Sequence, residues 1–159
     1  LEETKRPLFE SVEVLEACLG VLAGLVATLT IDRERMRLAA AEGYTTATAV
    51  ADSLVRRGVP FRSAHHIVGR LVGEAERLGI GLDALPDSAL VAALLGSDDP
   101  RARALANEPG SADALRAAAA IEGALASADV IGGTAPGRVQ AALAGARARL
   151  DRELGAGPA

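Results

Sequence analysis

The amino-acid sequence predicts an all-α fold, in which a long helix of a central oligomeric helical bundle is followed by a small helical C-terminal domain. Half of the 159 residues are hydrophobic (50%), yet only 2% are aromatic. A core built from Leu, Val, Ile and Ala suits close helix–helix contact better than sheet packing. Apolar residues also recur at intervals of three and four, which is the helical period. We expect residues 1–31 to form the last long helix of the bundle domain and residues 32–159 to form the C-terminal domain.

The first expected helix starts near Pro7, a residue type favoured in the first helical turn. Its large side chains alternate spacings of four and three, a heptad pattern that we call the heptad stripe: Leu8, Val12, Leu15, Leu19, Leu22, Val26 and Leu29. A second face carries small residues that let neighbouring backbones approach closely: Ala17, Gly20, Gly24 and Ala27. A helix of about 24 residues is about 36 Å long, more than the rest of this chain would bury. We therefore expect other chains to supply part of the bundle.

Shorter helices are expected after the first, each bounded by a residue that starts or stops a helix. Asp32 suits an N-cap position, and Gly43 and Gly58 suit helix ends. Leu82 and Leu85 are expected to plug the loop that spans residues 79–87. One expected helix is opened by Thr46 or Thr48 and runs to Arg57. The other helices expected in this part of the chain cover residues 32–41, 63–78 and 87–95.

The last third of the chain is rich in alanine. Residues 101–128 have high helix propensity but few bulky apolar side chains, and we expect them to be helical. The segment 132–136 is a turn whose proline starts a final helix. One face of that helix carries what we call the C-terminal stripe: Val139, Leu143, Ala146, Leu150 and Leu154.

Charge and cysteine content exclude several classes of partner. The formal net charge is -4 and the pI is near 5.2, which leaves no broad basic field for nucleic acid or an anionic membrane. The uncharged run 17–31 is shorter than the roughly 20 residues that a bilayer requires. Cys18 is the one cysteine, so neither a disulfide nor a multi-cysteine zinc site is expected within the chain. We expect a cytoplasmic protein with no cofactor, no metal and no secretion signal.

Two local patterns are weak candidates for other functions. His65 and His66 are adjacent, and neighbouring side chains on a helix point about 100° apart, so a metal site is not expected. The helix–turn–helix around Gly58 has several arginines nearby, but the chain as a whole is acidic and carries no basic arm. DNA binding is therefore not expected either.

Four segments resemble the argininosuccinate lyases, which belong to the fumarase/aspartase superfamily. The longest is residues 46–65, TATAVADSLVRRGVPFRSAH, which is similar to the C-terminal domain signature of that family. The others occur in the family's order: KRPLF at 5–9, LTIDRERM at 29–36, and GGTAP at 132–136 followed by Arg138 and Val139. The segment 97–130 matches the family less well.

The resemblance implies a carbon–nitrogen lyase that cleaves argininosuccinate to arginine and fumarate, and that acts in arginine biosynthesis. It also implies a homotetramer built on a central bundle of long helices, in which each active site gathers segments from three subunits. The catalytic serine of the family lies on a loop upstream of the part that this chain resembles. We therefore expect this chain to need the upstream part of its polypeptide and to be inactive alone.

Lys5 and Glu2 are the two candidate substrate-binding residues. The resemblance places at Lys5 a family lysine that faces the substrate near the start of the long helix. A lysine ammonium offers three donors and a full charge to a carboxylate whose negative charge grows during proton abstraction. A solvated lysine paired with Glu2 on the first turn is the competing reading. At Glu2 the family has a substrate-contacting glutamine, so a carboxylate there changes the charge of the site.

Two alternatives to argininosuccinate cleavage stay open. Glu2 and the poorly matched middle segment favour a diverged lyase that acts on another N-substituted aspartate. Ala49 and His66 also replace acidic residues of the signature, and we interpret both as packing or surface changes. The other alternative is a non-catalytic structural or oligomerisation module, because this family includes lens crystallins.

Overall fold

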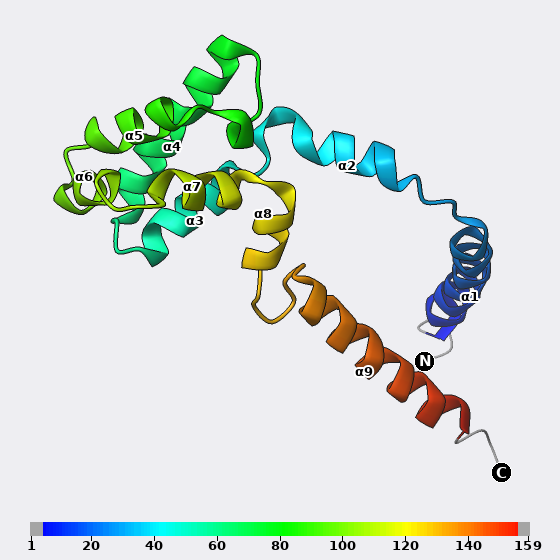
Figure 1. Cartoon of the computed structure of the whole chain (residues 1–159). Coiled ribbons are helices and arrows are strands. Elements are labelled where there is room, and N and C mark those ends of the chain that lie inside the picture. The colour runs from blue at the N-terminus through cyan, green and yellow to red at the C-terminus, as the bar shows by residue number, and fades with distance from the viewer. Residues whose placement is uncertain (1–4, 156–159) are drawn as a thin grey trace. The chain divides into compact units, whose positions relative to one another are not determined.

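The protein was analysed as a computed structural model that describes residues 5–155 (Figure 1). These residues form nine α-helices and two short 3₁₀ turns, and no strand occurs among them. The all-α prediction is confirmed. The chain divides into two compact units, residues 1–36 and 37–159. The domain boundary expected between residues 31 and 32 stays a prediction.

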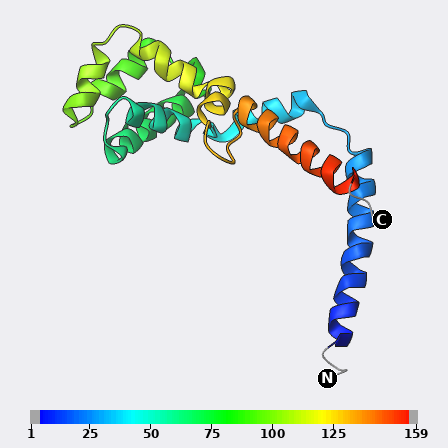
Figure 2. The ribbon, with the colours of Figure 1, turned by 90° about the horizontal axis from the view of Figure 1, so that it is seen from below.

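Helix α1, Lys5–Thr28, is a single rod that makes up most of the first unit (Figures 1 and 2). Its described residues begin at Lys5, so the expected start near Pro7 stays a prediction, and the hydroxyl of Thr28 donates to the carbonyl oxygen of Gly24 (3.0 Å) at its end. None of its residues is buried within the described chain. The heptad stripe and the small-residue face are therefore both available to other helices.

Helix α2, Arg33–Ala41, has the N-cap that its sequence predicts. The Oδ1 atom of Asp32 accepts a hydrogen bond from the backbone N–H of Arg35 at 3.0 Å, which satisfies one of the unpaired donors at the helix start. A 3₁₀ turn, Glu42–Tyr44, follows, and Gly43 has a φ of 67° there. Gly43 therefore ends the helix as expected, because a left-handed residue cannot continue it.

Helices α3, Ala47–Arg56, and α4, Phe61–Leu78, are joined by a short turn and pack against each other in the second unit. Gly58 has a φ of 90° between them, a conformation that costs a residue with a Cβ atom about 1 kcal/mol or more. Helix α4 begins at Phe61 and not at Ser63 as predicted. The reason is Pro60, which has an extended ψ of 140° and accepts the N–H of Ala64 at 2.9 Å, so it caps the helix directly.

The loop after α4 is plugged by apolar side chains, as predicted. Leu82 is 4% exposed and lies in the 3₁₀ turn Leu82–Ala84, and Leu85 beside it is 1% exposed. Helix α5, Asp87–Leu95, follows with the predicted bounds. The buried side chains of Leu82 and Leu85 hold this loop against the core.

The alanine-rich region is helical as predicted, but it is divided into α6, Pro100–Ala106, α7, Ser111–Ala119, and α8, Ile121–Ser127. Helix α6 is capped by Asp99, whose Oδ1 accepts from the backbone N–H groups of Arg101 and Ala102. Gly110 has a φ of 76° and Ala120 has an extended ψ of 145°. These two residues turn the chain because left-handed and extended backbone cannot continue an α-helix.

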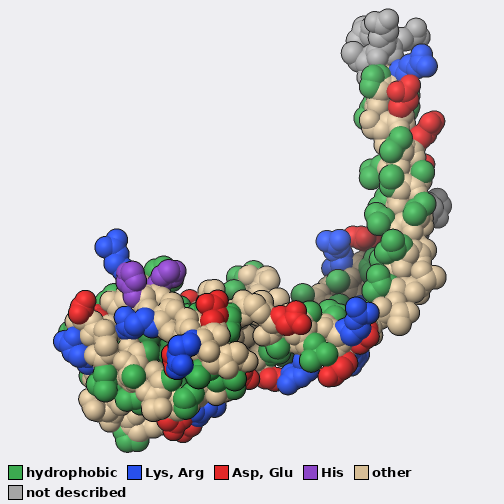
Figure 3. Space-filling model, turned by 90° about the horizontal axis from the view of Figure 1, so that it is seen from above, with side chains coloured by type: hydrophobic (Ala, Val, Ile, Leu, Met, Phe, Trp, Pro, Cys, Tyr) green, Lys and Arg blue, Asp and Glu red, His purple; other side chains and the backbone are tan. Residues whose placement is uncertain are grey.

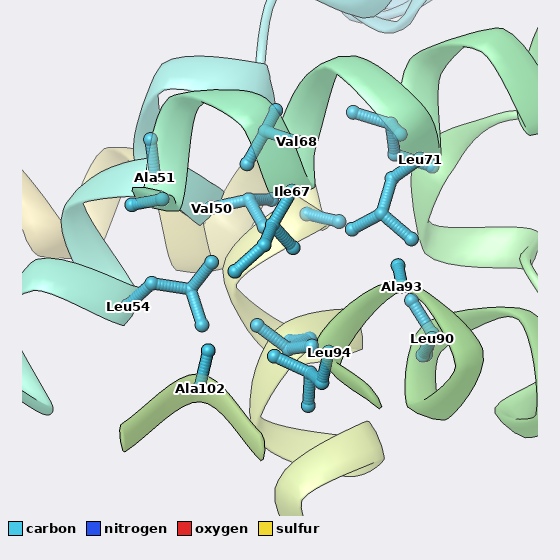
Figure 4. Close-up of a cluster of buried hydrophobic side chains, with 14 of the residues drawn as sticks. Val50, Ala51, Leu54, Ile67, Val68, Leu71, Leu90, Ala93, Leu94 and Ala102 are labelled. Carbon is cyan, nitrogen blue, oxygen red and sulfur yellow. The ribbon is translucent and has the colours of Figure 1, made fainter. Parts of the chain in front are cut away.

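One apolar core holds the second unit together (Figure 4). Helices α3, α4 and α5 supply most of its large side chains, and the shorter helices α6 and α7 add Leu105 and Leu115, both 0% exposed. Helix α9, Pro136–Gly155, starts at the predicted proline but contains no buried residue. The core therefore spans α3 to α7, and the stripes of α1 and α9 take no part in it.

Candidate functional site

Lys5, the first candidate residue, is the first described residue of α1 and is exposed to solvent. No acidic residue lies in the first described turn of the helix, whereas Arg6 is paired with Glu10 (Nε to Oε1, 3.1 Å). The ammonium group of Lys5 therefore lies in a turn of α1 that holds no carboxylate within the described residues.

Glu2, the second candidate residue, lies outside the described residues. The joint role of Glu2 and Lys5 in substrate binding therefore stays a prediction. Both residues belong to the first unit, as the heptad stripe does. The predicted substrate-binding end of this unit and its surface for other helices therefore share one short stretch of chain.

A pocket in the second unit is lined with hydroxyl groups, but it does not suit an anionic substrate. Thr45, Thr46 and Thr48 line one side, Asp52 contributes a carboxylate, and apolar residues of α8 line the other side. No lysine or arginine is among the lining residues. A dicarboxylate would meet the like charge of Asp52 without a cation to neutralise it.

His65 and His66 lie on the surface of the second unit, where they are the purple side chains in Figure 3. Their ring centroids are 6.1 Å apart and the ring planes are inclined by 83°. Within residues 5–155, no group of three or more His, Cys, Asp or Glu side chains could hold a metal ion. Whether the pair binds a metal ion stays a prediction.

Arg57, Arg101 and Glu108 form an ion-pair network that joins α3 to α6 and to the start of α7. The Arg57 guanidinium donates to Glu108 Oε2 (3.1 Å) and to the buried hydroxyl of Ser111 (2.8 Å). Arg101 donates to Glu108 Oε1 (2.8 Å) and, from its Nε, to the carbonyl oxygen of Arg57 (2.9 Å). Both oxygens of the carboxylate are thus held by a guanidinium, an arrangement among the stronger hydrogen bonds of proteins.

The network lowers the pKa of Glu108. Burial raises the pKa of Glu108, but the hydrogen bonds from Arg101 and Arg57 and their positive charges outweigh it, and the resulting pKa is lower than usual. One of the two terminal nitrogens of Arg57, Nη1, is buried and has no hydrogen-bond partner among the described residues. The network connects helices that close the core, so its role is structural and it does not form a catalytic site.

Three further charged pairs lie on the surface. A hydrogen bond from Arg77 lowers the pKa of Glu74, and a bond to Asp87 raises the pKa of Arg116. The pKa of Glu122 is lowered first by a backbone hydrogen bond and then by Arg37. Exposed pairs of this kind are screened by solvent and salt and contribute little to stability. They lie outside the polar pocket of the second unit, so they indicate no reactive group.

The network around Glu108 was not foreseen from the sequence. Arg57 and Glu108 are separated by 51 positions, and no local spacing rule connects residues so far apart. Arg57 was assigned to the end of a helix, which the structure confirms, since it is the C-cap of α3. Helix propensity predicted helical segments that include Arg57 and Glu108, but it did not predict that the two side chains form an ion pair.

The model of a protein family described as "Argininosuccinate lyase C-terminal" matches residues 44–121 of the chain. The match covers α3 to α7 and thus the whole apolar core. It also extends through residues 97–121, so our expectation that the segment 97–130 departs from the family is wrong for most of that segment. Alanine-rich sequence had obscured the similarity, because alanine is common in any helix.

Curated relatives match the rest of the chain as well. Argininosuccinate lyase of Mycolicibacterium paratuberculosis is 43% identical over 162 residues, which cover 100% of this chain and 31% of the relative. Argininosuccinate lyase of Saccharopolyspora erythraea is 42% identical over 139 residues, covering 87% of this chain and 26% of the relative. The chain thus spans less than a third of the length of these relatives.

A solved structure is also similar to this chain. It is an EDDS lyase variant with bound fumarate, with a TM-score of 0.67 and a sequence identity of 32%. The likeness covers 83% of this chain and 26% of that chain. The chain is therefore similar in sequence to a portion of argininosuccinate lyases, and in sequence and fold to a portion of an EDDS lyase.

Proposed function

Because the chain belongs to the argininosuccinate lyase family and corresponds to its C-terminal portion, we propose that it is part of an enzyme that cleaves argininosuccinate to arginine and fumarate. A base removes a proton from the carbon next to a succinyl carboxylate. The electron pair of that C–H bond forms the double bond of fumarate, and the C–N bond breaks. Its electron pair leaves with the nitrogen, which takes up a proton in arginine. The single observation that carries the proposal is the 43% identity over the whole chain.

Lys5 is the residue of this chain that we assign to the substrate. Negative charge grows on the succinyl carboxylate as the proton leaves, and an ammonium group placed beside it stabilises the transition state more than the ground state. The exposed position of Lys5 and the lack of an acidic residue in the first described turn of α1 support this role. Glu2, three positions before Lys5 in the sequence, would act on the same substrate.

The rest of the active site is supplied from outside this chain. The chain spans 31% of the length of a relative, and the catalytic serine of the family lies on a loop upstream of the part that this chain resembles. We propose that the upstream part of the polypeptide provides the base and most of the pocket, and that the isolated chain is inactive. Neither a cofactor nor a metal ion is needed for the elimination as written.

We also propose that α1 is a buried bundle helix of a homotetramer and not a membrane span. By length and composition α1 could cross a bilayer, with a mean hydropathy of 1.7. However, Glu13 and Glu16 lie within the helix, and a carboxylate at the bilayer centre costs about 2.5–3.5 kcal/mol. Its small-residue face and its heptad stripe suit helix partners, with Leu19 and Leu22 both more than half exposed in the single chain. A cytoplasmic location agrees with this assignment.

The test is release of fumarate from argininosuccinate by the full-length protein that carries this chain, followed by the ultraviolet absorbance of fumarate. The Lys5→Ala variant should lower kcat/KM by about a hundredfold, because loss of one donor to a developing charge has that order of effect. Arg6→Ala is the matched control, since Arg6 is already paired with Glu10, and it should keep most of the activity. Equal activity of Lys5→Ala and the wild-type protein would remove Lys5 from the site.

A second candidate function is cleavage of another N-substituted aspartate. The observation that favours it is the likeness to an EDDS lyase variant at 32% identity, together with the carboxylate of Glu2 in place of the family glutamine. If a folded oligomer releases no fumarate from argininosuccinate, other N-substituted aspartates should be assayed by the same absorbance change. Release from one of them would identify the diverged lyase, and release from none would favour the structural module.

A further inference from the structure

Two helices of the chain carry long apolar stripes that the described structure leaves uncovered. On α1 the heptad stripe is exposed along its length, with Leu15 at 58% and Leu19 at 55%. On α9 the C-terminal stripe is exposed in the same way, with Leu143 and Leu150 both at 52%. Exposed rows of this length on a helix mark a surface for another helix.

The two stripes have matching intervals when the helices run in opposite directions. Read backward from Val26, the heptad stripe has steps of four, three and four, and read forward from Val139, the C-terminal stripe has steps of four, three and four. In this register the stripes meet in four layers: Val26 with Val139, Leu22 with Leu143, Leu19 with Ala146, and Leu15 with Leu150. Continuous layers of this kind are the basis of packing between helices with heptad patterns.

The charges flanking the stripes select the same orientation. Glu16 follows Leu15 directly and Arg147 follows Ala146, so the antiparallel register places these opposite charges on the same side of neighbouring layers. Charged pairs beside the apolar seam set partner choice and orientation. In a parallel arrangement with the same number of layers, Arg147 would lie beside Cys18 and Glu16 would face no charged side chain.

The uncharged parts of the two helices also coincide. Between Glu16 and Thr28 helix α1 contains no charged residue, and between Arg138 and Arg147 helix α9 contains none. The antiparallel register lays these two uncharged segments against each other and leaves the acidic half of α1 beside the basic half of α9. Within the described chain, neither Glu16 nor Arg147 makes an ion pair, so the proposed contact would give each a partner.

We propose that α9 of one copy docks antiparallel on the heptad stripe of α1 in a second copy of the chain. The proposal rests on the self-association proposed above and adds which elements meet and in which register. The small-residue face of α1 is left for other bundle helices. A helix that is apolar on two faces requires partners on both, and α9 supplies one of them.

The register can be tested with the natural cysteine, because it places Cys18 opposite Arg149 beside the seam. The variant Arg149→Cys, made in the full chain and oxidised, should form a disulfide between copies in yield several-fold above the wild-type protein, which carries Cys18 alone. Ala148→Cys is the matched control on the outer face of α9 and should stay at the wild-type yield. Arg147→Cys reports the parallel arrangement. Non-reducing gels give the yield, and mass spectrometry of the linked peptides confirms the pair.

A yield for Arg149→Cys no higher than for Ala148→Cys would overturn the proposal, as would a higher yield for Arg147→Cys than for Arg149→Cys. A disulfide between Cys18 and position 149 within one chain would also overturn it, because α9 would then cover α1 of its own copy. Light scattering of the wild-type protein separates these outcomes from failure of the proposed function. An oligomer without the Arg149→Cys link means that the copies meet through other surfaces.

A charge exchange gives a second, independent readout. Glu16→Arg alone should raise the dissociation constant of the oligomer several-fold, because two positive charges would then face each other. The double variant with Arg147→Glu should restore it, since the pair is reformed with reversed sign. Failure of the double variant to recover association, with normal helix content by circular dichroism, would contradict the proposed contact.

Discussion

The compact region α3–α7 and the long helices α1 and α9 use the same kind of residue to opposite effect. In the compact region Leu54, Ile67 and Leu94 are 0% exposed, whereas Leu19 of α1 and Leu143 of α9 are 55% and 52% exposed. Both regions are helical and rich in leucine. They differ in burial: the apolar side chains of the compact region are covered by other helices of the same chain, whereas those of α1 and α9 are not covered within the described chain.

The width of the apolar face accounts for this difference. Helix α4 buries one face, made of Ala64, Ile67, Val68, Leu71 and Ala75, and exposes charged residues on the other. Neighbours on one side of α4, the helices α3 and α5, are sufficient to cover such a face. Helix α1 is apolar on two faces over its second half, so a single neighbour could not cover it.

The largest effect is expected from truncating a core leucine. Leu54→Ala should lower the free energy of unfolding of the compact region by about 2–5 kcal/mol, because Leu54 is fully buried and its loss leaves a cavity. Tyr44, the one tyrosine, packs against this core, so its fluorescence in a urea titration reports the unfolding. The matched control, Leu19→Ala in α1, should leave that titration unchanged and weaken self-association instead. Equal effects of the two changes on the tyrosine signal would contradict the division between the regions.

A smaller effect is expected from breaking the network that closes the compact region. Arg57→Ala removes the hydrogen bonds to Glu108 and Ser111 and leaves the buried Ser111 hydroxyl without that donor, so the free energy of unfolding should fall by about 1–3 kcal/mol. The neighbouring exposed Arg56→Ala should change it by less than about 0.5 kcal/mol. If both variants unfold at the urea concentration of the wild-type protein, the network is not a stabilising feature.

The smallest effect concerns the pH dependence of the same network. The pKa of Glu108 in the folded chain lies below its ordinary value of 4.5, so the charged form stabilises the fold at neutral pH and this contribution is lost as the pH falls from 4.5 toward the folded pKa. The difference in unfolding midpoint between the wild-type protein and Glu108→Gln should therefore shrink in that range. Arg101→Gln, which removes a donor to the carboxylate, should make the wild-type-like pH dependence shallower. A difference that stays constant with pH would show that Glu108 carries no linked proton.

Sequence reasoning was successful where local rules apply. The bounds of α5, the Asp32 cap of α2 and the proline start of α9 follow from residues within one helical turn. Lys5 was singled out by resemblance, and the structure adds that its side chain is exposed on α1. Gly110 divides the alanine-rich segment in the structure. The glycine is visible in the sequence, but we predicted a helical segment because the residues around it have high helix propensity.

The sequence by itself determined that the chain is helical, where most helices begin and end, and which apolar stripes they carry, because propensity, capping and periodicity act over a few residues. The tertiary structure alone decided which stripes are buried within the chain and that Arg57 and Glu108 meet across 51 positions. The physical reason is that burial and ion pairing between distant segments depend on how helices pack, and many packings are compatible with the same local pattern.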